Sequence, residues 1–277
     1  MKNVLILTNF STNSWNSIKY ALSLFKNKRC NFYLLNTTKI IENVAINNQT
    51  FVQNKKEKDP KTAFDKLMEK ISSSPLKGKH VFIPIITDTE IIAATKLQVE
   101  EKNIDLIVMR TDGKPFFGNM KENSIFENVI TKVKCSILVV PNDTRFRKIN
   151  EVAFPTDYTN FNEANLLQNI TDLLRANQSK LRFVHLAKKD EVLDKEQLWN
   201  KETLQDYFKD QSDSFHVEIN KNFEVSIENF IDKMGIDLII MAAKNLNLLE
   251  EILFRPRINN VKYYSKTPFL ILHQSIN

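Results

Sequence analysis

An internal repeat is the feature that most constrains how this 277-residue chain folds. Four short apolar segments of the first half return, in the same order, in the second half. They are NVLILTNFS and EVAFPTDYT, NFYLLNT and KLRFVHL, IDLIVMRT and IDLIIMAA, and SILVVP and FLILHQ. The chain therefore reads as two copies of one unit, each about the size of an ordinary domain.

The repeat also predicts where one domain ends and the next begins. We expect a first domain over residues 1–142, a linker over residues 143–148 and a second domain over residues 149–277. The second copy is shorter between its second and fourth strands. The first copy carries the polar stretch 47–60 there, which we expect to be an exposed loop.

Within each copy, short β-branched runs alternate with longer helical patterns, which is typical of a parallel sheet with crossover helices. The near-continuous apolar runs Leu106–Met109 and Leu238–Met241 suit strands that are covered on both faces. Ser11, Asp88 and Asn222 are candidate helix N-caps. The fold class expected is therefore α/β. The helices predicted are Thr12–Phe25, Pro60–Ser72, Asp88–Lys102, Asn119–Lys132, Phe161–Ala176, Lys195–Asp210, Phe223–Met234 and Leu246–Tyr263.

Composition narrows the class of protein. Hydrophobic residues make up 42% of the chain, and no apolar run approaches the roughly 18 residues that a membrane helix needs. No secretory leader precedes the first strand, so we expect a cytoplasmic protein without a membrane partner. Two cysteines, Cys30 and Cys135, are too few for a disulfide framework or a cysteine-rich metal site, and the expected strand order keeps them too far apart to pair.

The two halves differ in charge. Residues 1–148 carry 24 Lys+Arg and 14 Asp+Glu, whereas residues 149–277 carry 15 and 19. A basic half could attract nucleic acid, but the sequence holds no recognised nucleic-acid motif, and nucleic acid is therefore an unlikely partner. The opposite net charges favour docking of the two halves on each other.

The ends of the strands follow a recognisable pattern. The first strand of each copy ends in a turn, Leu7–Ser11 and Pro155–Thr159, and the second strands end as Leu35–Thr37 and Val184–Leu186. The last strand of the first copy lies in Lys134–Pro141, which reads Lys-Cys-Ser-Ile-Leu-Val-Val-Pro. In this order, and repeated, these pieces resemble the universal stress protein family in its tandem form.

That resemblance implies a specific architecture. Members of the family have a Rossmann-like, five-stranded parallel sheet with strand order 3-2-1-4-5, and they pair through the last strand. For a tandem chain, the resemblance implies two such domains that form an internal pseudo-dimer through Ile137–Val140 and Phe269–Leu272. A further homodimer of the whole chain stays open.

Family members that bind nucleotide carry Gly-x2-Gly-x9-Gly-Ser/Thr after strand four, where glycines let the backbone approach the phosphates. The matching positions of the first copy are Arg110, Gly113, Asn123 and Ser124, so one glycine and the hydroxyl remain. Those of the second copy are Ala242, Asn245, Arg255 and Pro256, which keep no part of the motif.

In the family, an acidic residue at the end of the first strand contacts the nucleotide. Here the acid is kept in the second copy, which lacks the glycine motif, and is missing from the first copy, which keeps part of that motif. The first copy has Asn9 and the second has Asp157. If ATP binds, the resemblance makes Asn9, Arg110, Gly113, Asn123, Ser124 and Asp157 the candidate residues. Two of them have an ordinary alternative, since Ser124 could cap a helix and Asp157 could form a turn.

We therefore expect a non-enzymatic stress-response protein that acts through contacts with an unidentified protein partner, with no cofactor. The alternative is an ATP-binding stress module that uses a noncanonical loop in the first domain. No catalytic or metal-ligating residues are predicted, because His80, His216 and His273 lack paired spacing and no Gly-x-Ser-x-Gly motif exists. His185 is predicted to be a core histidine.

Overall fold

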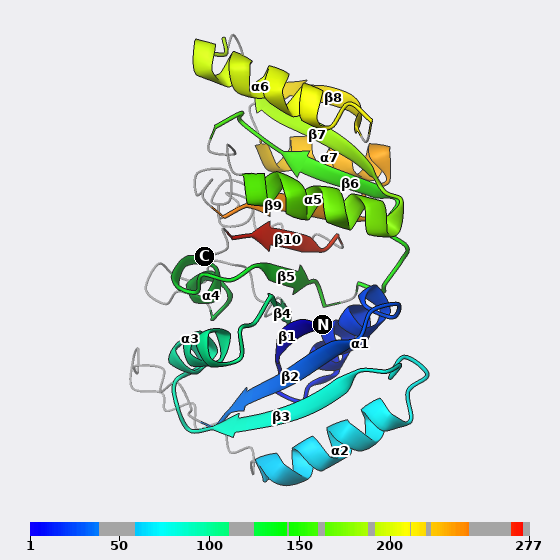
Figure 1. Ribbon diagram of the computed structural model, residues 1–277, viewed down its shortest axis with the longest axis vertical. Helices are drawn as coiled ribbons and strands as arrows, with labels where there is room; N and C mark the ends of the chain where they lie inside the picture. Colours follow the sequence, from blue (N-terminus) through cyan, green and yellow to red (C-terminus); the bar gives the residue numbers. More distant parts are fainter. Residues whose placement is uncertain are drawn as a thin grey trace.

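The computed structural model describes residues 1–38, 59–110, 125–142, 144–159, 164–187, 192–210, 212–219, 223–243 and 267–273. The strands in these ranges form one ten-stranded sheet with the order β3-β2-β1-β4-β5-β10-β9-β6-β7-β8 (Figure 1). Each half has the predicted order 3-2-1-4-5, and the two halves meet at their fifth strands. The prediction of two tandem α/β domains joined as a pseudo-dimer is confirmed.

The first half contains nine of the described elements. They are β1 (Lys2–Leu7), α1 (Thr12–Leu24), β2 (Cys30–Thr37), α2 (Pro60–Ser72), β3 (Val81–Thr87), α3 (Ile91–Glu101), β4 (Leu106–Arg110), α4 (Ile125–Lys132) and β5 (Ile137–Val140).

The second half repeats this order over its described residues. Its elements are β6 (Glu151–Pro155), α5 (Ala164–Asn177), β7 (Lys180–Ala187), α6 (Lys195–Tyr207), β8 (Ser212–Ile219), α7 (Phe223–Met234), β9 (Leu238–Ala242) and β10 (Phe269–Leu272).

The two halves are joined by a single antiparallel pair of strands. Residues Phe269, Leu270 and Ile271 of β10 lie opposite Val139, Leu138 and Ile137 of β5. Strands are parallel within each half, as the βαβ pattern predicts. The sheet therefore continues from one half into the other, and the predicted pairing through the last strands is present.

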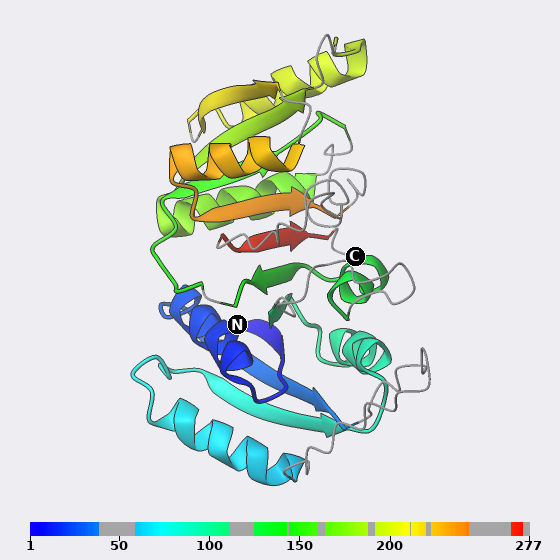
Figure 2. The same ribbon diagram turned by 180° about the vertical axis from the view of Figure 1, so that it is seen from behind.

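Helices cover both faces of this sheet (Figures 1 and 2). One apolar core contains buried residues of α1, α2, α5 and α6, and a second core on the opposite face contains residues of α3, α4 and α7. Ile107 of β4 and Ile239 of β9 are fully buried in the second core. These two strands are therefore central, as their continuous apolar runs predict.

The segment between the halves is anchored to the first half. The side-chain amide of Asn16 donates to the carbonyls of Asn142 at 3.1 Å and Thr144 at 2.6 Å. The ring of Phe146 lies edge-on to Tyr20 of α1, with centroids 5.2 Å apart. The predicted linker thus packs along α1, while the domain boundaries themselves stay a prediction.

Two predicted helix limits need correction by three residues. The helix predicted to end at Asp210 ends at Tyr207, because Phe208 is its C-cap. The helix predicted from Asp88 begins at Ile91, and its N-cap is Glu90, whose carboxylate accepts from Ile92 N at 3.0 Å and Ala93 N at 3.1 Å. The Thr87 hydroxyl accepts from Thr89 N at 3.1 Å, and this turn delays the start of the helix. By contrast, Pro60–Ser72 and Phe223–Met234 have the predicted limits.

Other predictions fall partly or wholly outside the described residues. These are the exposed loop over 47–58, the first residues of the helix predicted over Asn119–Lys132, the cap Asn222 and the helix Leu246–Tyr263. Ser11 is the N-cap of α1, as predicted.

Both cysteines are free and buried. Cys30 is the first residue of β2, and burial raises the pKa of its thiol. The thiol of Cys135 contacts the Ile104 carbonyl at 3.4 Å, and burial raises the pKa of Cys135 to about 12. Neither cysteine is therefore a reactive thiolate at neutral pH.

Among the described helices, none has the length and apolar character needed to cross a membrane.

Candidate functional site

The turn after the first strand of each half is the candidate site that the sequence analysis singles out. In the first half it follows β1 and contains Thr8 and Asn9. In the second half it follows β6 and contains Thr156 and Asp157. Both threonines are buried, and each donates its N–H to the neighbouring strand, Thr8 to Leu35 O at 2.9 Å and Thr156 to Val184 O at 3.0 Å.

An aromatic residue in each turn adopts a left-handed backbone conformation. Phe10 has φ of 59° and Tyr158 has φ of 61°, values that non-glycine residues seldom adopt. The preceding threonine hydroxyl holds each of them, because it accepts from Phe10 N at 3.2 Å and from Tyr158 N at 2.9 Å. The same hydroxyl turn therefore fixes the backbone in both halves.

The family resemblance assigns the nucleotide-binding acid to the positions of Asn9 and Asp157. In both halves this side chain accepts hydrogen bonds from residues of its own turn. Asn9 is exposed, and its Oδ1 accepts from Ser11 N at 3.3 Å. Asp157 is half-buried, and its Oδ1 accepts from both Thr159 N at 3.0 Å and Thr159 Oγ1 at 2.8 Å. Both side chains act as turn residues in this structure, the ordinary alternative considered for Asp157.

A polar side chain from the neighbouring strand, β2 in the first half and β7 in the second, forms a hydrogen bond with the backbone of each turn. Asn36 Nδ2 donates to Thr8 O at 2.8 Å, and His185 Nδ1 lies 3.0 Å from Thr156 O. His185 is buried, so the prediction of a hydrogen-bonded core histidine is confirmed. The two side chains stand at matching places in the repeat and make the same contact.

The second half adds a polar clamp from α6. Gln197 Nε2 donates to Asp157 O at 2.8 Å, and the fully buried Asn200 donates through Nδ2 to Tyr158 O at 2.7 Å. Gln197 is itself fixed by a capping box with Asp194. In the first half, α2 contacts the turn through an edge-to-face pair of Phe10 and Phe64 with centroids 4.8 Å apart.

Sequence reasoning missed Gln197 and Asn200. The pattern Asp194-Lys-Glu-Gln197 was a signal for the capping box, but nothing in it predicts that Gln197 also reaches the turn. Asn200 gives no signal, because its role depends on how α6 is placed over β6 and β7.

Tyr158 fills the space between the turn and α6. It is buried, and its ring lies over His185 with centroids 5.0 Å apart. Burial raises the pKa of Tyr158 to about 12, so the phenol is neutral near pH 7. Its hydroxyl has no hydrogen-bond partner among the described residues. The turn of the second half is therefore covered by the Tyr158 ring and by α6.

The remaining candidates follow the fourth strands. Arg110 is the half-buried last residue of β4 and already has an interaction partner in the structure. Because β1 pairs with β4 in parallel, Asn9 and Arg110 lie at the same edge of the sheet. Gly113, Asn123 and Ser124 lie outside the described residues, as do Asn245, Arg255 and Pro256 of the second copy.

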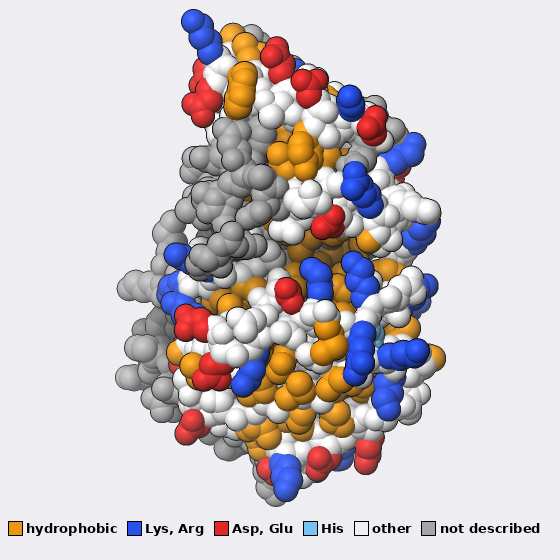
Figure 3. Space-filling view, viewed as in Figure 1, with side chains coloured by type: hydrophobic (Ala, Val, Ile, Leu, Met, Phe, Trp, Pro, Cys, Tyr) orange, Lys and Arg blue, Asp and Glu red, His pale blue; other side chains and the backbone are white. Residues whose placement is uncertain are grey.

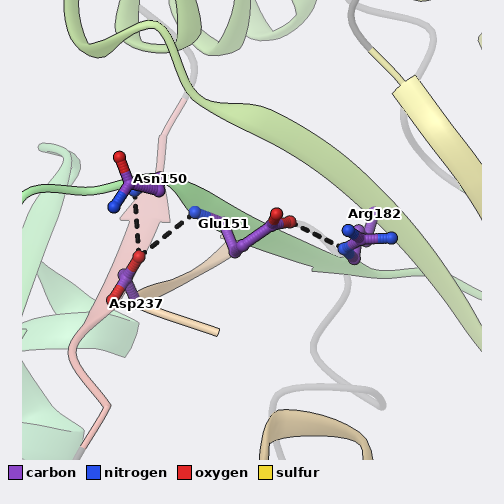
Figure 4. A network of polar contacts seen from close by, with 4 residues as sticks. All are labelled: Asn150, Glu151, Arg182 and Asp237. Carbon is purple, nitrogen blue, oxygen red and sulfur yellow. Dashed lines mark hydrogen bonds and ion pairs between the residues drawn. The ribbon is translucent and has the colours of Figure 1, made fainter. Parts of the chain in front are cut away.

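At the opposite ends of the strands, the repeated Ile-Asp-Leu segments make a structural contact. Asp105 N donates to Asn3 O at 2.9 Å, and Asn3 N donates back to Asp105 Oδ2 at 2.7 Å. In the second half, Asp237 N donates to Glu151 O at 2.9 Å, and Glu151 N donates back to Asp237 Oδ2 at 3.2 Å, the second of which is drawn in Figure 4. These aspartates therefore tie the fourth strand to the first.

The second-half pair belongs to a wider network. Asp237 Oδ2 also accepts from Asn150 N at 2.9 Å, and Glu151 pairs with Arg182 Nε at 2.7 Å (Figure 4). In the part of the chain that the structure describes, no three His, Cys, Asp or Glu residues come together as a metal site.

The chain is similar to known proteins in both sequence and fold. The sequence model of the universal stress protein family matches residues 1–141. A universal stress protein from Archaeoglobus fulgidus DSM 4304 aligns over 99% of this chain and 97% of its own, with TM-score 0.62 and 14% identity. A putative universal stress protein from Pseudomonas aeruginosa UCBPP-PA14 aligns over 98% and 93%, with TM-score 0.59 and 11% identity.

The cytoplasmic domain of a prokaryotic cation chloride cotransporter also aligns, over 98% of this chain and 94% of its own, with TM-score 0.54 and 10% identity. At such identities these structures show a common fold alone. No curated protein matches the chain. Because the family match spans more than half of the chain and the second half repeats its strand order, the chain belongs to the universal stress protein family.

Proposed function

We propose that this chain is a cytoplasmic stress-response protein that acts through contacts with other proteins, without catalysing a reaction and with weak or lost nucleotide binding. Membership of the universal stress protein family supports the stress-response role. The proposal that nucleotide binding is weak or lost rests on the contacts that Asp157 makes in the second half.

The engagement of Asp157 is the observation that carries the proposal. Its Oδ1 is shared between the N–H and the hydroxyl of Thr159, and its carbonyl is held by Gln197. A ligand that used this carboxyl oxygen would have to break contacts that stabilise the turn. The acid that the first half lacks is thus present in the second half but is already occupied.

An exposed apolar patch on α6 supports action through protein contacts. Leu198 and Trp199 are adjacent on α6 and are exposed by 46% and 58%, and we call these two residues the α6 patch. Large exposed aromatic side chains are enriched where proteins bind one another. The patch lies on the same helix whose opposite side clamps the second-half turn.

Calorimetry with ATP and nucleotide-free protein tests the nucleotide part of the proposal. We expect no saturable one-to-one binding with Kd below about 10 μM, which corresponds to roughly −7 kcal/mol. Saturable binding below that value would overturn it. Mass analysis of the purified protein for co-purifying nucleotide is an independent check.

The competing function is an ATP module in the first half. Arg110, beside Asn9 at the edge of the sheet, is the observation that favours it, because a guanidinium can bind phosphate. ATP binding that disappears in Arg110→Ala or Ser124→Ala but survives in Asp157→Ala would establish this alternative.

The contact part is tested by crosslinking in stressed cells that express the full chain. Trp199→Asp should reduce the crosslinked partners several-fold, whereas Leu97→Asp, at an apolar position of α3 that is 48% exposed against 58% for Trp199, should not. Both variants should unfold at the same urea concentration as the unchanged protein. Equal crosslinking of the two variants would show that the α6 patch is not the contact surface.

A further inference from the structure

A cavity of about 1110 Å³ opens beside the junction of the two halves. Its floor is formed by Leu138 of β5 and by Leu270 and Leu272 of β10, on the face that α1 and α5 cover. It reaches Ile104–Leu106 and Lys134–Ser136, where β4 and β5 begin. The cavity, which we call the interdomain groove, therefore lies away from the turns that end β1 and β6.

The walls of the interdomain groove are also apolar. Leu24 of α1 and Leu173 of α5 line it and are half-buried. Phe146 lines it as well, and its ring packs on Tyr20 of α1. Apolar side chains are visible between the positions of α1 and α5, with Lys and Arg side chains around them (Figure 3). The groove can therefore exclude water from an apolar chain.

The charged residues of the groove are mostly basic. The acids are Glu100, Asp105 and Asp172, and the carboxylate of Asp105 already accepts from Asn3 N. No lining cation takes part in an ion pair within the described ranges. These cations are Lys2, Lys26, Lys28, Lys134, Lys148 and Arg175.

A neutral hydroxyl adds a hydrogen-bond donor to this lining. Tyr20 is 2% exposed, and burial, together with the nearby carboxylate of Asp237, raises the pKa of its phenol. The hydroxyl therefore keeps its proton at physiological pH and can donate to an anion. A leucine floor, basic residues and a phenol are suited to a ligand with one apolar part and one acidic part.

We propose that the interdomain groove binds an amphipathic organic anion, with its apolar chain on the leucine floor and its carboxylate or phosphate head near the lining cations. Small-molecule pockets are commonly about 300–1,000 Å³, so a cavity of about 1110 Å³ can enclose such a molecule. This site does not depend on whether the turns bind nucleotide.

Calorimetry on the full chain tests the ligand class. The probes are dodecanoate and dodecyl phosphate, each below the concentration at which it forms micelles. Both should bind saturably at one site, and the tighter of the two identifies the preferred head group. Dodecyltrimethylammonium, which has the chain but the opposite charge, and inorganic phosphate, which has no chain, should bind at least tenfold more weakly.

Matched variants test the location. Leu173→Trp, which fills the groove, and the double variant Lys148→Glu/Arg175→Glu, which reverses two lining charges, should each weaken dodecanoate binding at least tenfold. Leu97→Trp and Lys96→Glu, on the exposed side of α3, should leave it unchanged. Urea unfolding of each variant shows whether it is folded.

Failure of both anionic amphiphiles to bind would overturn the proposal, and so would three further results. One is equal binding of the cationic and anionic amphiphiles, and another is anion binding that the groove variants do not weaken. The third is a dimer in sedimentation experiments that Leu173→Trp converts to a monomer, because a second copy of the chain would then cover the groove.

Discussion

The turns after β1 and β6 have the same backbone but different surroundings. In both halves a threonine hydroxyl holds an aromatic residue at positive φ, and a second-strand side chain supports the threonine carbonyl. In the first half α2 meets the turn through an aromatic pair, whereas in the second half α6 clamps it with two side-chain amides.

This difference shows that the shape of the turn and its accessibility are separate properties. The hydroxyl and Asx contacts are local, so a few residues in sequence are enough to reproduce them in both copies. The clamp is not local, because Gln197 and Asn200 arrive from a helix about 40 residues away. A repeat can therefore keep its scaffold while one copy closes the site.

The largest expected loss of stability comes from shortening a buried isoleucine in a central strand, and it should be the same in both halves. Ile107→Ala and Ile239→Ala each remove a fully buried side chain from a central strand, and each should cost about 2–5 kcal/mol through lost burial and cavity formation. Urea unfolding followed by circular dichroism measures the loss. A cost below about 0.5 kcal/mol for either one would break the equivalence of β4 and β9.

The next effect should be confined to the second half. Asn200→Ala leaves the carbonyl of Tyr158 without its donor, which should cost about 1–3 kcal/mol. Hydrogen exchange should accelerate at the amides of Tyr158 and Thr159 but not at those of Phe10 and Ser11. Glu202→Ala, exposed on the same helix, is the control, and unchanged exchange in Asn200→Ala would show that the clamp does not hold the turn.

Acid should affect the two halves through different histidines. His80 is 8% exposed, packs edge-on to Phe32, and has no hydrogen-bond partner for either ring nitrogen among the described residues. Burial lowers the pKa of His80, so the unfolded chain binds this proton more readily. Its contribution to stability is complete above the unfolded value of about 6.5 and is lost as the pH falls below it.

His80→Phe should therefore flatten the decline of the free energy of unfolding below pH 6.5. The decline should not vanish, because burial also lowers the pKa of His273, the residue after β10 in the second half. Urea titrations at a series of pH values provide the measurement. A decline as steep as that of the unchanged protein would show that His80 is not the acid-sensitive group.

The smallest effect tests the equivalence of the two supports. Because Asn36 and His185 make the same contact, exchanging them as Asn36→His/His185→Asn should cost no more than about 1 kcal/mol. His185→Leu removes the contact and is the control that should cost more. If the exchanged protein were as unstable as the control, the supports would not be interchangeable.

The parts of the fold that follow local patterns could be predicted from sequence. The strand order follows from the repeat and the family resemblance, and Ser11 is recognisable as a cap because it precedes an apolar helical pattern. The cap predicted at Asp88 was wrong, since the Thr87 hydroxyl forms its own turn and moves the helix start to Ile91.

The site was harder to predict than the fold. Asn9 and Asp157 could be placed at strand ends, but only the packing of α6 shows that the Asp157 turn is clamped. The interdomain groove gives no sequence signal, because its floor and walls come from β5, β10, α1, α5 and the segment between the halves. Such long-range arrangements depend on how whole elements pack.

The antiparallel pairing of β5 and β10 also determines where further growth of the sheet could occur. Because β5 and β10 pair with each other at the centre of the sheet, the edge strands are β3 and β8. Pro84 in β3 has no N–H to offer a neighbour, and β8 follows β7 through a register shift at Leu181 and Arg182. Both features discourage edge-to-edge pairing of this sheet with another sheet at β3 and β8.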